Sequence, residues 1–442
     1  MQRAWIAFVL AGLSSYLCAQ TAGTPEQVAL LRAKEKVLAS LDAIPNYTCL
    51  QTIERVQLKG EPGRQPDGSP LPLDALLERA ETSETVRVEV GFVDSKELYS
   101  WPGEGSFEEK PLPEMVGFGF ISSGTFATAL RNAFLGSTEL FRAAGEENLN
   151  GRRAIRYNYL ARGAGRGVLL GDGDGYTRVP YSGALWIDAA TFDVLRLRIQ
   201  ADALSSLPDI SEIWGQLDYV ASSIGNGAFL VPQSAHMLVG FANEVQKHNR
   251  SVFSACRLFG VSSELSFDDG PAAITPANAR TEKLELPADA ILRVKFGTGI
   301  DSEKSSVGDK IEGQLERAVK KGGQAIVPKG AIVTGRIRRL ERFRKPARHV
   351  LGLEITELRF ENRVARIQAT LRQVSPIPGQ TSGGPRNFDP AAGMITQFPH
   401  GQDQTRIFTD PNIPGVGMFP INAGKFKIRP GWKTVWKVET AE

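Results

Sequence analysis

The sequence predicts an α+β protein in which one curved antiparallel sheet with two helices is followed by a separate all-β barrel or sandwich domain. Short segments of alternating apolar and polar residues recur along the chain, and 45 Gly and 26 Pro supply turns between them. A hydrophobic content of 42% and a charged content of 23% are typical of a globular protein. Because 442 residues exceed what one core usually organises, two domains are expected.

The clearest predicted element is a hairpin at residues 181–200. Residues 184–187 and 194–199 have strand composition, and the polar residues between them favour a turn. In the second arm, apolar residues alternate with Arg196 and Arg198, which predicts one buried and one solvated face. The hairpin holds no nucleophile or metal-ligand motif, so it indicates a scaffold.

The first twenty residues are typical of an export signal. Arg3 supplies the positive start, and residues 4–17 form an apolar stretch too short for a stable membrane span. The small residues that follow predict cleavage near Ala19 or Gln20. Lipid attachment at Cys18 is the alternative, but the preceding residues lack the small side chain that such sites prefer. We therefore expect a periplasmic or otherwise exported protein.

Removal of this leader would leave Cys49 and Cys256 as the remaining cysteines. In an oxidising compartment two cysteines most economically form one disulfide, here closing a loop of about 200 residues. A reactive thiol is the alternative, but the sequence shows no activating base beside either cysteine. We predict a structural disulfide between Cys49 and Cys256.

Composition divides the chain into four segments. They are a signal peptide (1–20), a first domain (21–268), a linker (269–283) and a β-barrel domain (284–442) in which residues 375–423 form a long Pro- and Gly-rich loop. The linker is polar, rich in Pro and Ala, and without periodicity.

About ten strands and two helices are expected in the first domain. Thr24-Pro25 begins the first helix, Pro45 follows its end, and Thr125 caps the second helix. First-domain strands are predicted at 47–56, 85–93, 96–101, 148–160, 184–187, 194–199, 216–224, 229–245 and 251–267. Second-domain strands are predicted at 291–296, 311–319, 325–327, 332–340, 350–360, 365–374 and 425–438.

In the first domain a leading helix and strand 47–56 precede a hairpin in which Gly183-Ala184-Leu185-Trp186-Ile187-Asp188 is followed by Leu195-Arg196. This combination resembles the exported lipoprotein-carrier fold, the LolA-like half-barrel, over roughly residues 24–268. In that fold the hairpin commonly reads Trp or Val-Ile-Asp, a turn, then Val-Leu-Arg. The resemblance implies a curved antiparallel half-barrel with helices on its open face and a concave apolar cavity able to hold acyl chains.

The second domain carries four short motifs: Ile300-Asp301-Ser302, Gly308-Asp309, Ile326-Val327-Pro328-Lys329-Gly330 and Thr334-Gly335-Arg336. They resemble the TrbI-like β-barrel scaffold of conjugal-transfer and type IV secretion channels. In that family an Ile-Pro-x-Gly turn precedes a Gly-containing strand. This sequence lacks the family's inner-membrane anchor, so the resemblance implies the barrel alone.

Charge separates the two halves. Residues 281–442 hold 27 Lys and Arg against 17 Asp and Glu, a net charge of +10, which leaves −7 for residues 1–280. Seven bases stand close together in the second half: Arg336, Arg338, Arg339, Arg342, Arg344, Lys345 and Arg348. A solvated strand edge whose charges deter edge pairing is the favoured interpretation. A docking patch for an anionic membrane surface or an acidic envelope protein is the alternative.

Catalytic and metal-binding motifs are absent from the sequence. It contains no Gly-x-Ser-x-Gly or His-Glu-x-x-His, and none of the four histidines stands at metal-ligand spacing from another. The glycine-rich runs at 163–167 and 171–175 are expected in a hairpin loop, where calcium binding through Asp172 and Asp174 would lack further acidic ligands. We expect no enzyme activity, no cofactor, no metal and no nucleic-acid partner.

The expected function is therefore that of a non-enzymatic cell-envelope protein that binds or carries an acylated, lipid or lipoprotein ligand in the concave half-barrel. Aromatic side chains that could line its cavity, or equally fill a core, are Phe92, Tyr99, Trp101, Phe118, Phe120, Trp186 and Phe229. An envelope scaffold with no small-molecule ligand is the alternative. An open apolar cavity of several hundred Å³ would favour the carrier.

Overall fold

The computed structural model describes most of the chain between Gly23 and Glu439. The described residues are 23–60, 63–65, 68–94, 96–117, 119–122, 128–134, 140–161, 168–171, 176–201, 204, 207–259, 282–375, 407–409 and 413–439. The predicted signal peptide, most of the predicted linker, most of the predicted long loop and both glycine-rich runs except residue 171 lie outside these residues.

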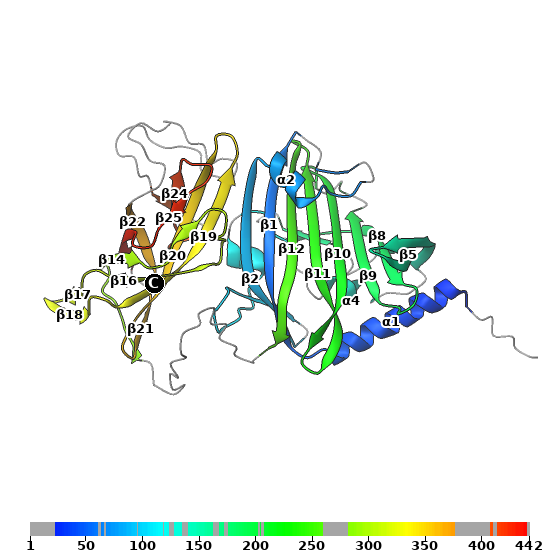
Figure 1. Cartoon of the computed structure of the whole chain (residues 1–442), viewed down its shortest axis with the longest axis horizontal. Helices are drawn as coiled ribbons and strands as arrows, with labels where there is room; N and C mark the ends of the chain where they lie inside the picture. The colour runs from blue at the N-terminus through cyan, green and yellow to red at the C-terminus, as the bar shows by residue number, and fades with distance from the viewer. Residues whose placement is uncertain are drawn as a thin grey trace, which may run out of the picture.

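Ten antiparallel strands form a curved, unclosed sheet in the first half of the chain (Figure 1). Their spatial order is β4–β5–β8–β9–β10–β11–β12–β1–β2–β3. The bounds are β1 Tyr47–Lys59, β2 Thr82–Val93, β3 Lys96–Ser100, β4 Phe141–Leu149, β5 Arg152–Ala161, β8 Tyr181–Asp188, β9 Val194–Ala201, β10 Ile210–Ile224, β11 Gly227–Phe241 and β12 Val245–Leu258. A separate hairpin is formed by β6 (Val168–Gly171) and β7 (Tyr176–Val179).

Three helices cover one face of this sheet. α1 (Pro25–Ala43), α3 (Leu112–Val116) and α4 (Thr128–Phe134) place apolar side chains in the main core. The predicted start of α1 is confirmed, since Thr24 and Gln27 form a reciprocal capping box. A further helix, α2 (Leu73–Arg79), packs on the opposite face against Val56 and Leu58. Neither α2 nor α3 was predicted, because each is too short to show helical periodicity.

Side chains alternate between the two faces of the sheet along the predicted hairpin. On β9, Leu197 is buried in the main core, while Arg196 and Arg198 lie on the other face. Asp188 stabilises the turn, because its carboxylate accepts hydrogen bonds from the backbone N–H groups of Ala190 and Thr191, both at 2.8 Å. The hairpin prediction is confirmed.

The second half of the chain forms short strands around a second set of buried aromatic side chains. Its strands pair in the order β22–β26–β14–β16–β19–β20–β24, with β21 also beside β20. The bounds are β13 Glu282–Lys283, β14 Ile291–Phe296, β15 Ile300–Asp301, β16 Lys310–Leu315, β17 Val319–Lys321, β18 Gln324–Val327, β19 Ile332–Phe343, β20 Arg348–Phe360, β21 Arg363–Arg366, β22 Ala369–Ser375, β23 Phe408–Thr409, β24 Gly417–Ile421, β25 Lys427–Ile428 and β26 Lys433–Val438. β23 and β24 fall where a loop was predicted, since pairing of β24 with β20, and of β23 with β24, outweighs their Pro- and Gly-rich surroundings.

The two halves meet along β2 and β19. Backbone pairing joins Ser83 to Arg342 and Thr82 to Phe343, in an antiparallel register. The apolar clusters on the two sides merge into one connected core. The second half is therefore attached to the sheet by backbone hydrogen bonds and by shared apolar packing.

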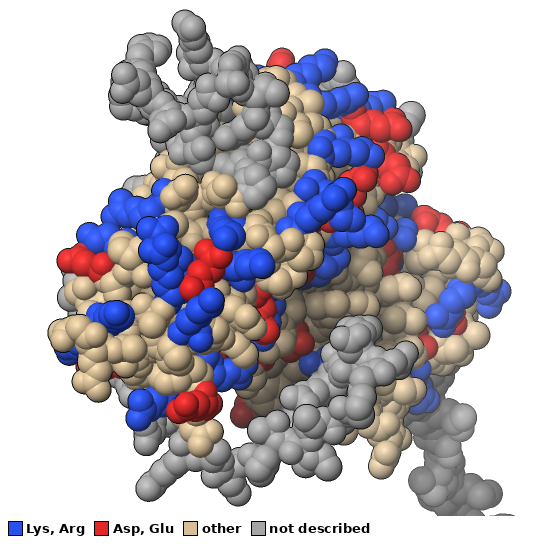
Figure 2. All heavy atoms as spheres, turned by 60° about the vertical axis from the view of Figure 1, so that its left-hand side comes forward, with Lys and Arg blue, Asp and Glu red and all other residues tan. Residues whose placement is uncertain are grey.

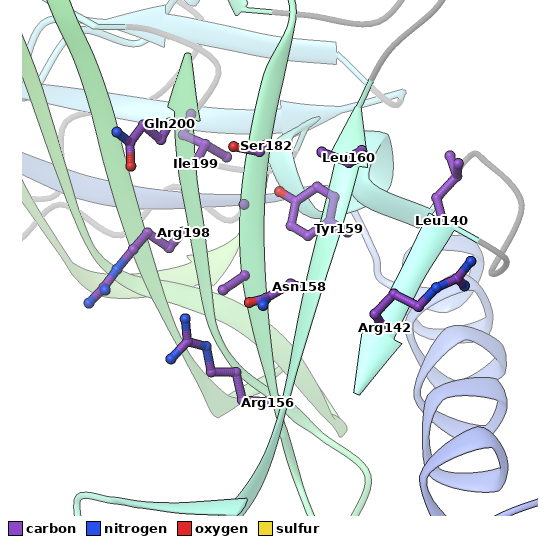
Figure 3. Close-up of a pocket in the computed structure, with 12 residues that line it drawn as sticks. Leu140, Arg142, Arg156, Asn158, Tyr159, Leu160, Ser182, Arg198, Ile199 and Gln200 are labelled. Atoms are coloured by element: carbon purple, nitrogen blue, oxygen red, sulfur yellow. The ribbon is translucent and has the colours of Figure 1, made fainter. Parts of the chain in front are cut away.

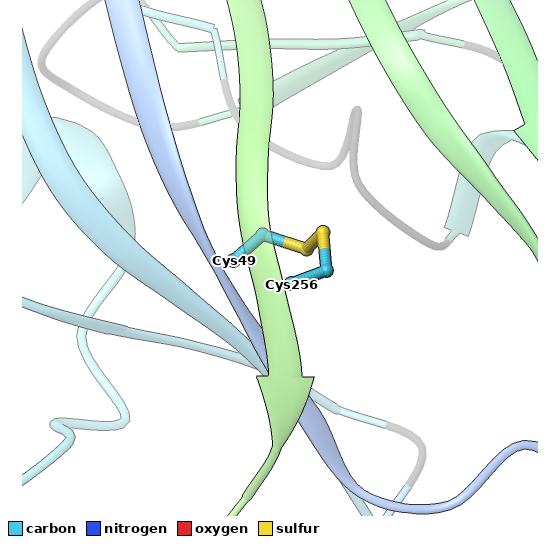
Figure 4. The surroundings of a disulfide bond; sticks show 2 residues. All are labelled: Cys49 and Cys256. Carbon is cyan, nitrogen blue, oxygen red and sulfur yellow. A yellow bond between two sulfur atoms is a disulfide. The ribbon is translucent and has the colours of Figure 1, made fainter. Parts of the chain in front are cut away.

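A disulfide joins Cys49 on β1 to Cys256 on β12, as predicted (Figure 4). The two residues are 207 positions apart in the sequence, yet their Cα atoms lie 4.1 Å apart. β1 and β12, the first and the last strand of this sheet in sequence, are neighbours in space. The disulfide therefore reinforces their pairing.

Replacing both cysteines (Cys49→Ser with Cys256→Ser) should lower the free energy of unfolding by about 4–5 kcal/mol, because the long loop is then open in the unfolded chain. Urea denaturation under oxidising conditions measures the loss, and wild-type protein in reductant is the matched comparison. Equal stability of the three samples would contradict this role for the disulfide.

Candidate functional site

The aromatic side chains predicted to line a concave cavity are mostly part of the packed core. Phe92, Tyr99 and Trp101 are buried there, Phe229 is partly buried and packs against the same core cluster, and Phe120 is half-buried. None of these residues lines the pockets of about 640 Å³ and about 300 Å³ in the described part of the chain. The concave apolar cavity stays a prediction.

Trp186 lies on the other face of the sheet from this core. Leu185 and Ile187, its neighbours on β8, are in the core, so the pleat turns Trp186 away from it. Trp186 belongs to a smaller cluster with Ala184 and Leu195 and does not line the concave side. Phe118, the seventh predicted lining residue, lies outside the described residues.

The seven predicted bases of the docking patch do not lie on one surface. Arg336, Arg338 and Arg339 are 4%, 9% and 8% exposed, so they cannot belong to a solvated edge or an open docking patch. Their neighbours on β19 pair with the first sheet, which places these three arginines at or beside the junction of the two halves. Sequence spacing could not reveal this for Arg336 and Arg338, because Glu104 and Met115, to which they donate hydrogen bonds, lie more than 200 residues earlier.

Arginine side chains hold the loop after β3 at this junction. Arg336 Nη2 donates to Glu104 Oε1 at 2.5 Å, and Arg338 Nη2 donates to the Met115 carbonyl oxygen at 3.0 Å. Both guanidiniums lie over the ring of Trp101, at 5.4 and 5.0 Å from its centre. These bases are engaged in stabilising the contact between the halves.

The other predicted bases gather at the tip of the β19–β20 hairpin. Arg342, Arg344 and Lys345 are exposed, and Arg348 stacks on Phe343 at 4.9 Å. Arg342 and Arg344, with Glu78 and Glu81 from the first half, also line a pocket of about 300 Å³, which therefore has mixed charge. Figure 2 shows Lys and Arg spread over this side of the molecule with Asp and Glu between them. Anionic docking at the tip stays a prediction.

A larger pocket lies on the face of the first sheet that carries Trp186. It has a volume of about 640 Å³ and crosses β4, β5, β8 and β9 (Figure 3); we call it the β4–β9 groove. Its lining residues are Leu140, Arg142, Arg156, Asn158, Tyr159, Leu160, Ser182, Gly183, Ala184, Arg198, Ile199 and Gln200. The groove is therefore a mixed apolar and cationic surface.

The lining residues are sorted by strand register. Arg198, Ala184, Asn158 and Arg142 stand opposite one another across β9, β8, β5 and β4. Gln200, Ser182 and Leu160 form the next row on the same face. Figure 3 shows Leu160 and Leu140 toward one end of the groove and the guanidinium groups of Arg156 and Arg198 toward the other.

The cationic end of the groove belongs to a ladder of stacked arginine and tryptophan side chains. Arg156 and Arg198 lie over Trp186 at 5.4 and 5.2 Å from the ring centre. Arg198 also lies over Trp214, at 5.6 Å, and Arg64 lies over Trp214 at 5.4 Å. The ladder fixes the planes of the arginines that face the groove.

A buried histidine pair ends this ladder. His236 stacks edge-on against Trp214, and its Nε2 is 3.1 Å from Nδ1 of His248. Burial, with His248 and nearby Arg250 and Arg64, lowers the pKa of His236 to about 3. Burial and Arg64 lower the pKa of His248 to about 4. Both rings are neutral at pH 7.

Within the described residues, no three His, Cys, Asp or Glu side chains come together as a metal site. Nor does any helix in that part of the chain combine the length and apolar character needed to cross a membrane. Asp172 and Asp174 lie outside the described residues.

Sequence analysis missed Arg142, Arg156 and Arg198 as site residues. Arg198 was recognised as lying on a solvated face, but its cross-strand neighbours depend on the β5–β8–β9 register. The available signal was Leu160, an apolar residue that lies between Arg156 and Arg162 in the sequence and is exposed in the structure.

No protein-family model matches this sequence, and no curated protein matches it. Among solved structures, a domain named for outer-membrane lipoprotein sorting, from Vibrio parahaemolyticus, is 11% identical over 53% of this chain and 94% of its own, with a TM-score of 0.25. A DUF1329 family protein from Desulfovibrio piger is 13% identical over 55% of this chain and 98% of its own, with a TM-score of 0.23. Both TM-scores lie below 0.5, so neither likeness serves as an argument for the function of this chain.

Arg338→Ala should lower the free energy of unfolding by about 3 kcal/mol, because it leaves the Glu354 carboxylate and the Met115 carbonyl without their buried partner. Arg342→Ala, on the same strand but exposed, should change it by about 0.5 kcal/mol or less. Urea denaturation compares the two variants, and equal losses would show that burial at the junction does not matter.

The histidine pair should make the protein less stable in acid. The unfolded histidines, with a pKa of about 6.5, take up protons before the folded ones do, so stability is full above pH 6.5 and falls toward pH 4. Each histidine contributes on the order of 1.4 kcal/mol per pH unit in this window. Urea denaturation from pH 7 to pH 4 should show a shallower slope in His236→Gln with His248→Gln. An unchanged slope would assign the acid sensitivity to other groups.

Proposed function

We propose that this protein is a non-enzymatic, exported protein of the cell envelope that binds an acylated ligand, and that the β4–β9 groove is where the acyl chain lies. One observation carries this proposal. Leu140 and Leu160 are 37% and 43% exposed, and both line the same pocket of about 640 Å³. Exposed leucines brought together in a groove are typical of a binding surface for an apolar ligand.

The size of the groove suits such a ligand. Pockets of roughly 300–1,000 Å³ are the usual size for small-molecule sites. Each methylene removed from water contributes about 0.8 kcal/mol, so burying about eight would contribute about 6 kcal/mol, a dissociation constant on the order of tens of micromolar. An acyl chain bound with this affinity can dissociate again, as a protein that carries and releases a ligand requires.

Binding without catalysis is supported by the groove's chemistry. Among its described lining residues there is a serine hydroxyl, Ser182, but no His, Asp, Glu or Lys to act as its base. The hydroxyl is therefore a hydrogen-bonding group in this proposal.

Export is supported by the disulfide. The Cys49–Cys256 bond is of the kind that persists in oxidising compartments outside the cytosol. The predicted signal peptide at residues 1–20 would direct the chain to the export machinery.

A scaffold without a small-molecule ligand is the second candidate. It is favoured by the concave side of the sheet, where Phe92, Tyr99 and Trp101 are buried under helices rather than facing a cavity. In that case both halves would serve protein contacts.

Leu160→Glu should abolish acyl binding, because it places a carboxylate at the apolar end of the groove. Leu77→Glu is the matched control, since Leu77 is 38% exposed but lies on α2, away from the groove. Titration with a long-chain fluorescent acyl probe, and native mass spectrometry of protein purified without detergent, measure the binding. A wild-type protein that neither co-purifies with nor takes up an acyl species would favour the scaffold.

A further inference from the structure

Two arginine side chains stack on one indole ring at the cationic end of the β4–β9 groove. The guanidinium carbons of Arg156 and Arg198 lie 5.4 and 5.2 Å from the centre of the Trp186 ring. They come from β5 and β9, the two strands that flank β8, and Figure 3 shows their guanidinium ends toward one another. The ring therefore holds two positive charges close together in fixed positions.

An acidic side chain, Glu147, contacts this cluster and forms an ion pair with Arg156. Glu147 Oε2 accepts from the Trp186 Nε1–H at 2.8 Å, and Oε1 accepts from Arg156 Nη1 at 3.1 Å. The Trp186 bond, with Arg156, holds the pKa of Glu147 below its usual value, so it is a carboxylate at neutral pH. Arg198 donates to the neutral amide oxygen of Gln216 at 3.1 Å.

The groove itself has a net positive charge. Its lining includes three arginines, Arg142, Arg156 and Arg198, and none of its described lining residues is Asp or Glu. Arg142 and Arg198 stand at the two ends of one cross-strand row, with the small Ala184 and the amide of Asn158 between them. The floor between the cations therefore carries a small side chain, Ala184, and a neutral hydrogen-bond donor, the Asn158 amide.

We infer that the β4–β9 groove binds a compact oxyanion, a carboxylate or a phosphate, that terminates the ligand's acyl chain. This inference rests on the proposed function and adds the chemistry of the head group. Arg156 and Arg198 hold the oxyanion, and the chain runs toward Leu140 and Leu160. Planar guanidinium groups held in place bind carboxylate and phosphate oxygens with short, charge-assisted hydrogen bonds.

The arrangement selects against neutral amphiphiles. A neutral acyl ester would cover the same leucines but would add no charge-assisted hydrogen bond to the guanidiniums. An acyl anion gains the apolar contact and also balances the charge of the groove. Anionic and neutral amphiphiles of equal chain length should therefore differ in affinity by tenfold or more.

The first experiment uses the wild-type protein and three probes. Isothermal titration compares hexadecanoate, the hexadecanoyl monoester of glycerol, and inorganic phosphate, all below the aggregation limit of the amphiphiles. Hexadecanoate should bind at least tenfold more tightly than the neutral ester, and phosphate alone only weakly. Raising the salt concentration from about 50 mM to about 500 mM should weaken hexadecanoate binding and leave the ester unchanged.

The second experiment uses variants. Arg156→Gln with Arg198→Gln should remove the preference for hexadecanoate and keep binding of the neutral ester. Arg153→Gln is the control on the same strand, since Arg153 is 72% exposed and outside the groove. Arg198→Lys keeps the charge and should retain part of the preference, which separates loss of charge from a general loss of fold.

Each outcome bears on one of the two proposals. Equal binding of the acid and the ester, unaffected by salt, would overturn the oxyanion inference and leave the acyl-binding function standing. Phosphate bound as tightly as hexadecanoate would support an anion site but overturn the acyl-binding function. No binding of either amphiphile would overturn both.

Discussion

The pairing of β1 with both β2 and β12 is the constraint on which the first sheet depends. β1 follows directly after α1, and its two neighbours come from residues 82–93 and 245–258. The strands from β3 to β11 therefore lie, in sequence, between the two neighbours of β1. The chain passes from β1 to β2 on one side and comes back beside β1 through β12 on the other side. The Cys49–Cys256 disulfide links β1 covalently to β12 and so stabilises their pairing. The attachment of the second half depends on it as well, since β19 pairs with β2.

Much of the fold could be predicted because its signals are local. Alternation at Leu197 and Arg198, the capping box of Thr24 and Gln27, and the turn after Asp188 each depend on residues close in the sequence. The short helices α2 and α3 were missed because tertiary packing holds them rather than periodicity. For the same reason the sequence predicts a loop where β24 lies, although β20 provides its partner.

The candidate site could be predicted only in part, because it is made by cross-strand register. Trp186 was selected as an aromatic strand residue, but its face is decided by the core positions of Leu185 and Ile187. The cluster of bases beginning at Arg336 looked like one surface patch in the sequence. In the structure, one part lies buried beside Trp101, and another lies at an exposed hairpin tip. The sequence therefore shows that these bases are close together along the chain, but it does not show which of them are buried and which are exposed.

The contact of Arg336 and Arg338 with Trp101 also has a consequence for how the chain is made. More than 200 residues separate the tryptophan from the arginines that cover it, and synthesis proceeds from the first to the second. During that interval the indole ring and the neighbouring α3 are without their cover, as is the part of β2 that later pairs with β19. The growing chain thus presents an apolar surface beside a strand edge, the combination that promotes aggregation of nascent polypeptides. Final folding of the first half therefore depends on residues of the second half that are synthesised later.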